Sequence, residues 1–219
     1  DYGLMGFAMS RYSGCWTGFK CVGDIIESTA SVSIDQDRLE IKTPSDFDFP
    51  EDGIHIRWPD SPIEQEKRLI SVKLKAAQAF VHVNKLDRVS HAVTKKRLGI
   101  VAPGKAWLNV CQAFDELGLS ESERKNLGIG VFKVAMPWPL EPNRIRSWAE
   151  GFAEVIIIEE KRNLIEDQLA RIIYDLPEKK RPSLIGKYDM DGNLLVPEFG
   201  ELNGTLIARI IANRFLDDG

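Results

Sequence analysis

The chain has 219 residues, a length that suits one large domain or one domain with part of a second. Apolar residues make up 43% and charged residues 28%, as in soluble globular chains, and no aliphatic run approaches the ~20 residues of a membrane helix, so no membrane span is expected. The net charge of −4 and the pI near 5.5 exclude nucleic acid as the main expected partner, because phosphate binding needs a concentrated basic face.

The cysteine and histidine content predicts neither a disulfide framework nor a metal centre. The three cysteines are an odd number without CxxC spacing, which does not suit a cysteine-ligated zinc or iron–sulfur site. The histidines lack HxH and HExxH spacing and are expected to be ordinary surface or partly buried residues. No secretory signal peptide is expected at Asp1, and a reducing cytoplasmic location fits. The residues concerned are Cys15, Cys21, Cys111, His55, His82 and His91.

Residues 1–30 are rich in glycine, aromatic residues and cysteine, which is not a surface composition. Small residues recurring among large ones favour close packing of one helix against another, and so apolar a stretch is expected to be the tail of a preceding domain. A helix is expected to continue through 24–29. Alternation of apolar and polar residues in 31–34 and 39–41 predicts a short hairpin.

Prolines punctuate residues 43–61, which are therefore expected to form an extended linker. A helix is expected to begin at Ser61, which can cap it, with Glu64 completing a capping box. Apolar residues at intervals of three and four predict that this helix runs to about Lys85, within a connecting region at 62–94. The apolar stripe consists of Ile70, Leu74, Ala77 and Val81.

Strand-like and helix-like patterns alternate, with short loops, through residues 95–219. This succession predicts an α/β domain of three-layer α/β/α architecture, in which helices cover both faces of a mostly parallel sheet. The expected strands are 98–102, 128–135, 152–158 and 183–186, and the expected helices are 105–117, 143–150, 162–174 and 202–215.

The wholly aliphatic segment 155–158 is followed at once by four charged residues. A strand without polar residues must be covered on both faces, as in a parallel sheet, and its carboxyl end lies where open α/β sheets bind ligands or partners. The two adjacent carboxylates diverge, so we expect them to pair with lysine or arginine side chains and to form a partner surface. The residues expected at this surface are Lys105, Glu159, Glu160, Lys161 and Arg162.

Three glycine-containing motifs indicate turns rather than binding sites. Gly104-Lys105 opens a helix after a strand, but Ala106 stands where a P-loop has Ser or Thr. The glycines at 128 and 130 are not followed by the third glycine of a dinucleotide-binding loop. Residues 189–193 resemble the start of a calcium loop but lack its later glutamate and acidic spacing.

The segment 136–142 is rigid and aromatic, and two interpretations of it stay open: a packed loop, or a docking surface with Trp138 as its anchor. No Ser-His-Asp or Cys-His arrangement can be assembled from local motifs. The candidate functional residues are therefore interface positions, and no catalytic, cofactor-binding or metal-binding residue is expected.

Several segments, taken in order along nearly the whole chain, carry a resemblance to a known family. They are SRYSGCWTGFK (10–20), LGIV with GK (98–101, 104–105), WPLEP (138–142), EEKR with IE (159–162, 165–166) and IGK (185–187). Together they resemble the indolepyruvate ferredoxin oxidoreductases, in the long form with fused subunits. These are thiamine-diphosphate-dependent enzymes of the 2-oxoacid:ferredoxin oxidoreductase superfamily. Ala102-Pro103 and Trp107 are mild departures from the pattern.

The resemblance implies that the chain is an internal fragment of such an enzyme. Residues 1–42 would be the tail of the domain that binds the pyrimidine half of the cofactor, and 95–219 would be similar to the transketolase C-terminal domain. The diphosphate-binding Gly-Asp-Gly motif, the activating glutamate and the cysteine clusters are not in this sequence. Thiamine diphosphate, Mg²⁺ and 4Fe–4S clusters are thus implied for the parent enzyme and not for this fragment.

Two functional hypotheses follow. In the first, the parent decarboxylates an aryl 2-oxoacid, passes electrons to ferredoxin and forms an acyl thioester with coenzyme A. The fragment would then hold neighbouring cofactor-binding domains in register across a homo-oligomer, with Arg11 and Tyr12 facing a neighbouring domain or the substrate. In the second, the chain is a non-enzymatic α/β module that binds an acidic or nucleotide-like ligand at the carboxyl edge of its sheet. The residues of that edge are Lys105, Glu159, Lys161, Arg162 and Lys187.

Overall fold

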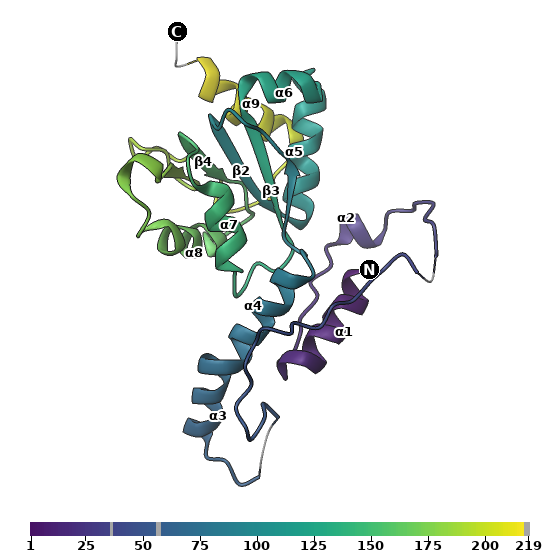
Figure 1. Ribbon diagram of the computed structural model, residues 1–219. Coiled ribbons are helices and arrows are strands. Elements are labelled where there is room, and N and C mark those ends of the chain that lie inside the picture. Colours follow the sequence, from purple (N-terminus) through teal and green to yellow (C-terminus); the bar gives the residue numbers. More distant parts are fainter. Residues whose placement is uncertain (36, 56–57, 217–219) are drawn as a thin grey trace. The chain divides into compact units, whose positions relative to one another are not determined.

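A computed structural model describes residues 1–35, 37–55 and 58–216 (Figure 1). The chain folds as two compact units that divide between Lys85 and Leu86.

The first unit is helical and has a small core. Its helices are α1 (Tyr2–Ser13), α2 (Gly23–Ile26), α3 (Pro62–Arg68) and α4 (Leu74–Val83), with one π-helical turn, η1 (Leu69–Lys73). Helix α1 packs against α4, and the ring of Tyr12 lies among three phenylalanine rings that join α1, α4 and the segment between them. These rings are Phe47, Phe49 and Phe80.

The predicted start of α3 is confirmed, but the helical region is not uniform. The Ser61 hydroxyl accepts a hydrogen bond from the Glu64 amide at 3.3 Å, and the Glu64 carboxylate accepts one from the Ser61 amide at 2.9 Å. The π-helical turn η1 then holds an extra residue, which rotates the predicted apolar stripe out of phase. Ile70 consequently lies exposed, while Ala77 and Val81 farther along are buried.

The hairpin predicted for 31–34 and 39–41 is wrong: the described residues there form no strand. Val32 and Ile34 are exposed rather than packed on a core. A lone two-stranded hairpin is only marginally stable in water unless one of its faces is buried. The alternation of apolar and polar residues was therefore not enough to form strands here. The helix expected at 24–29 is limited to α2.

The second unit contains a five-stranded sheet of order β1-β3-β2-β4-β5. The strands are β1 (Arg88–His91), β2 (Leu98–Pro103), β3 (Ile129–Val134), β4 (Glu154–Ile157) and β5 (Ser183–Ile185). Strand β1 pairs antiparallel with β3, and the other neighbours pair in parallel. The mostly parallel sheet is therefore confirmed, with the antiparallel edge strand β1 as an element that the sequence patterns did not predict.

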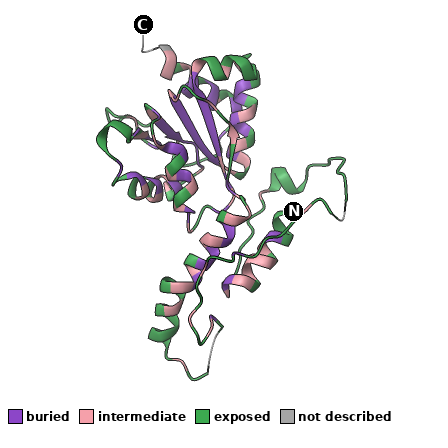
Figure 2. Ribbon diagram, viewed as in Figure 1, coloured by how far each residue is buried: buried purple, intermediate pink, exposed green. Residues whose placement is uncertain are grey.

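Helices cover both faces of the sheet, as the aliphatic strands require. They are α5 (Gly104–Glu116), α6 (Glu121–Leu127), α7 (Pro142–Ala149), α8 (Leu164–Ile173) and α9 (Gly204–Leu216), with a short 3-10 turn, η2 (Glu178–Lys180). Helices α5 and α9 build one apolar cluster with the sheet, and α7 and α8 build the other. Figure 2 shows the inner strands β2, β3 and β4 as almost completely buried.

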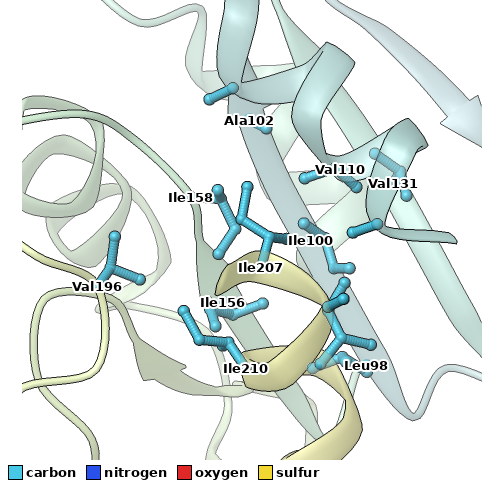
Figure 3. Packing of buried hydrophobic residues seen from close by; sticks show 14 of the residues in the cluster. Leu98, Ile100, Ala102, Val110, Val131, Ile156, Ile158, Val196, Ile207 and Ile210 are labelled. Atoms are coloured by element: carbon cyan, nitrogen blue, oxygen red, sulfur yellow. The ribbon is translucent and has the colours of Figure 1, made fainter. Parts of the chain in front are cut away.

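The residues of 155–158 alternate between these two clusters. Ile156 and Ile158 pack with Ile207 and Ile210 of α9, where Figure 3 shows them on one side of the sheet. Val155 and Ile157 belong to the cluster on the opposite face. The predicted three-layer α/β/α architecture is thus confirmed at strand β4 and the residue that follows it.

Two glycines that were considered for dinucleotide binding serve the fold. Gly128 ends α6 with φ +76°, and a Cβ there would lie 2.4 Å from the Lys95 carbonyl oxygen. Gly130 lies in β3, where a Cβ would be 2.7 Å from the ring of Phe152. A side chain at either position would collide with its neighbours, so both glycines are explained by backbone geometry and packing.

Candidate functional site at the carboxyl edge of the sheet

The strand order creates a switch point at the carboxyl ends of β2 and β4. The chain leaves β2 for β3 on one side and returns past β2 to β4 and then β5 on the other. Open α/β sheets place their ligand crevice at such a point. The structure brings most of the predicted edge residues to this edge, on the loops and helix starts that follow β2, β4 and β5. They are Lys105, Glu159, Glu160, Lys161, Arg162 and Lys187.

Glu159 lies inside the fold and does not make the predicted surface ion pairs. Only 4% of it is exposed, and its carboxylate accepts hydrogen bonds from the Ile165 amide (3.0 and 2.9 Å) and the Glu166 amide (3.0 Å). These amides are in the first turn of α8, so the carboxylate satisfies helix donors that would otherwise be buried without a partner. Burial raises the pKa of Glu159, while the two backbone amides and Lys187 oppose that rise.

Lys187 is a buried lysine that contacts Glu159. It is 2% exposed, and its Nζ donates to the carbonyl oxygens of Glu159 and, at 3.4 Å, Pro197. Its amide donates to Glu166 Oε2 at 3.0 Å. Burial lowers the pKa of Lys187, and the surrounding carboxylates, first among them Glu159, oppose this. The lysine therefore ties the loop after β5 to the end of β4.

At position 186 a side chain would displace the Glu166 carboxylate. A Cβ on Gly186 would lie 2.1 Å from Glu166 Oε2, the same oxygen that accepts the Lys187 amide. The IGK motif noted in the sequence therefore has a local physical reason.

The remaining charged residues of the edge fasten a segment that returns from far along the chain, residues 197–202. Lys161 Nζ donates to the Gly200 carbonyl at 2.7 Å, and Lys105 Nζ lies 3.4 Å from Glu201 Oε2. Glu160 Oε1 accepts the Leu202 amide at 3.2 Å. We refer to 197–202 as the return segment.

Arg162 and Trp138 are exposed at the same edge of the sheet. The loop that carries Trp138 is held by Gln168, whose Oε1 accepts the Leu140 amide and whose Nε2 donates to the Pro137 carbonyl, both at 2.8 Å. A fixed loop thus presents a half-exposed indole at this edge.

Arg11 and Tyr12 belong to the first unit. Arg11 is exposed, whereas Tyr12 packs among aromatic rings, and burial raises its pKa. The Tyr12 hydroxyl has no hydrogen-bond partner among the described residues.

Asp87, which no sequence pattern indicated, is a fully buried carboxyl group at the start of the second unit. Its Oδ1 accepts the amides of Ala135 (2.6 Å) and Met136 (3.2 Å), while its Oδ2 has no partner in the described part of the chain. Burial raises its pKa to about 6. A single aspartate next to a strand has no sequence signature, so only the fold identifies it.

The neighbouring residues Ser90 and His91 make contacts that join two elements of the second unit. Ser90 Oγ lies 3.1 Å from His91 Nδ1, but the same hydroxyl accepts the Trp107 indole N–H at 3.0 Å and so joins β1 to α5. Within residues 1–35, 37–55 and 58–216, no three His, Cys, Asp or Glu side chains are grouped as a metal site would need. No described helix is long and apolar enough to cross a bilayer.

Comparison with known proteins gives a family match over the second unit. A family model described as an indolepyruvate oxidoreductase domain matches residues 88–219. The indolepyruvate oxidoreductase subunit IorA of Methanothermobacter marburgensis is 25% identical over 146 residues, which cover 67% of this chain and 21% of that protein. The same subunit of Methanothermobacter thermautotrophicus is 24% identical over 169 residues, covering 74% and 25%. The chain thus spans at most 25% of the length of these relatives.

Two solved structures share a limited likeness. One is a 2-oxoglutarate:ferredoxin oxidoreductase from Magnetococcus marinus with 2-oxoglutarate, coenzyme A and succinyl-CoA bound (TM-score 0.43, 15% identity, 77% of this chain and 26% of that one). The other is a split-gene transketolase in an inactive β4 tetramer (TM-score 0.40, 16% identity, 59% and 41%). Similarity at this level identifies neither a site nor an activity.

Proposed function

This chain belongs to the indolepyruvate oxidoreductase domain family, and from that premise we propose that it is part of a thiamine-diphosphate-dependent 2-oxoacid:ferredoxin oxidoreductase. The parent enzyme decarboxylates an aryl 2-oxoacid, passes the electrons through 4Fe–4S clusters to ferredoxin, and forms an acyl thioester with coenzyme A. The observation that carries the proposal is the family match, which begins at β1 and spans the second unit.

We assign the chain a scaffold and interface role within a homo-oligomeric parent. Residues 1–42 are the tail of a pyrimidine-binding-type domain, 43–61 a linker, 62–94 a connection and 95–219 a transketolase C-terminal-like domain. The connection ends in β1, which joins the sheet of that last domain. The contacts of the carboxyl edge support this role, because Glu159, Lys187 and Lys161 make hydrogen bonds within the chain. Such internal contacts suit a rigid support that keeps neighbouring domains in position.

The residues at the switch point do not fit thiamine diphosphate. The first turn of α8, where an anion would otherwise be favoured, already holds the Glu159 carboxylate, whose charge opposes a diphosphate. Lys105, at the start of α5, is paired with Glu201. Among the described residues, no three His, Cys, Asp or Glu side chains are grouped in a way that could hold Mg²⁺. We therefore assign the cofactor, its Mg²⁺ and the clusters to other parts of the parent enzyme.

The alternative, a non-enzymatic module that binds an acidic or nucleotide-like ligand at the same edge, has less support. It needs Lys105, Lys161 and Lys187 to be available to contact a ligand. Each of these ammonium groups instead contacts an oxygen of this chain, in Glu201, Gly200 and Glu159 respectively. Arg162 and Lys161 are the exposed cations of the proposed set, and Lys161 donates to the Gly200 carbonyl.

The proposed function is tested with the full-length enzyme under anaerobic conditions. We expect reduction of ferredoxin, or of a viologen dye in its place, that requires both indole-3-pyruvate and coenzyme A. Aryl 2-oxoacids should be used in preference to short aliphatic ones. An enzyme that is loaded with its cofactors but does not oxidise any 2-oxoacid would refute the assignment.

A further inference from the structure

The loop that follows β5 exposes several large apolar side chains within one short excursion, residues 188–199 (Figures 1 and 2). The exposed fractions are 47% for Tyr188, 69% for Met190, 51% for Leu194 and 75% for Phe199. Single exposed apolar residues are ordinary, but four within 12 residues indicate a surface that another surface covers.

Internal hydrogen bonds hold this excursion in shape. The Asp189 carboxylate accepts the amides of Asp191 (3.0 Å) and Asn193 (2.8 Å) and the side-chain amide of Asn193 (3.1 Å). Tyr188 and Leu194 form a β-bridge, and the Lys187 carbonyl accepts the Leu195 amide at 2.8 Å. The apolar side chains are thus displayed on an ordered framework, which lowers the conformational cost of docking.

The charges of the excursion indicate which sign of charge a partner surface would carry. Residues 188–203 contain Asp189, Asp191, Glu198 and Glu201 and have neither lysine nor arginine. Glu201 is paired with Lys105, Glu198 faces the buried Lys187, and Asp189 faces Arg214, which is itself paired with Glu154. Residues 188–203 contribute only negative charge of their own, so the excursion keeps an acidic excess. A complementary surface is apolar at its centre and basic at its rim.

We propose that residues 188–199 dock a basic-rimmed apolar surface of the parent polypeptide that lies outside residues 1–219. The inference rests on the proposed function, in which this chain is one portion of a longer enzyme. The family relatives support that occupant, since the aligned residues cover only 21% and 25% of their lengths.

A second copy of this chain fits less well. Several of the basic side chains before β2 and β5, at the opposite edge of the sheet, are engaged within the second unit. Lys96 donates to the Trp148 and Glu150 carbonyls, Lys180 pairs with Glu150, and Arg181 donates to the Tyr174 carbonyl. Joining opposite edges of successive copies would also give a head-to-tail contact, which extends into filaments unless its rotation closes a ring.

The test is hydroxyl-radical footprinting of the full-length enzyme, with each rate normalised to that of the same residue in the unfolded enzyme. We expect Met190 and Phe199 to be oxidised several-fold more slowly than Tyr174, an exposed aromatic residue at the end of α8 that serves as the matched control. Zero-length carbodiimide coupling should join Asp191 or Glu198 to lysines outside residues 1–219.

Equal normalised rates for Met190, Phe199 and Tyr174 would overturn the proposal. Carbodiimide links that reach only residues 1–219 of a second copy, or only a separate protein, would overturn it as well. As a variant test, Met190→Glu with Phe199→Glu should increase oxidation of Tyr188 and Leu194 in the full-length enzyme, whereas Tyr174→Glu should leave it unchanged. The 2-oxoacid assay on the same preparation reports separately on the proposed function.

Discussion

Replacement of Glu159 by alanine tests whether the charged run after β4 serves the interior of the fold. The change removes the acceptor of the Ile165 and Glu166 amides in the first turn of α8. Leaving a buried amide without a partner costs about 1–3 kcal/mol, and loss of a helix cap costs about 0.5–2 kcal/mol. With two amides affected, we expect Glu159→Ala to lower the free energy of unfolding of the second unit by about 3 kcal/mol.

The assay is urea unfolding followed by tryptophan fluorescence. Trp148 and Trp107 lie buried and half-buried in the second unit, while Trp16 and Trp58 of the first unit are almost fully exposed and should change little. Fluorescence therefore reports mainly on the unit that contains the substitution.

The matched control is Glu160→Ala, the adjacent carboxylate in the same run. Glu160 accepts one hydrogen bond, from the Leu202 amide at 3.2 Å, and is only half-buried. We expect it to cost less than about 1 kcal/mol. Equal losses for the two variants, or a loss below about 1 kcal/mol for Glu159→Ala, would show that Glu159 acts as a surface charge and not as an internal cap.

Three further predictions concern buried positions. The pKa of Asp87 is raised from 3.8 to about 6, so its folded form binds a proton more tightly and stability falls as pH rises through this range. Asp87→Asn should therefore gain about 2.4 kcal/mol relative to the wild type between pH 4 and pH 7, measured by urea unfolding at both pH values, and a constant difference would contradict this. Gly186→Ala should displace the Glu166 carboxylate and destabilise the second unit by about 1–3 kcal/mol, which thermal unfolding would detect. Gly130→Ala should clash with the ring of Phe152 and destabilise the second unit by about 1–3 kcal/mol. An unchanged midpoint of thermal unfolding would argue against the packing described.

Sequence patterns sufficed where local chemistry and periodicity agreed. The aliphatic residues 155–158 required cover on both faces, and the structure alternates them between two clusters. The capping box at Ser61 likewise fixed the start of α3. The same signal is present at Ser120 and Glu123, where it begins α6, so this unpredicted helix was visible in the sequence.

Other features depend on residues that are distant along the chain. Strand β1 is short and partly exposed, and it becomes a strand because β3 offers a free edge. The return segment meets Lys161 and Lys105 only after the sheet has formed. The edge at which the charged residues lie was therefore predictable from the sequence, whereas the inward direction of Glu159 was not.

The central claim is that this chain supports a thiamine-diphosphate enzyme without binding the cofactor itself. The direct measurement is calorimetric titration of thiamine diphosphate with Mg²⁺ into the 219-residue chain and, separately, into the full-length enzyme. We predict saturable binding to the full-length enzyme and none to the 219-residue chain. Saturable binding to the 219-residue chain would contradict the claim, and binding to neither would contradict the assignment of the parent as a thiamine-diphosphate enzyme.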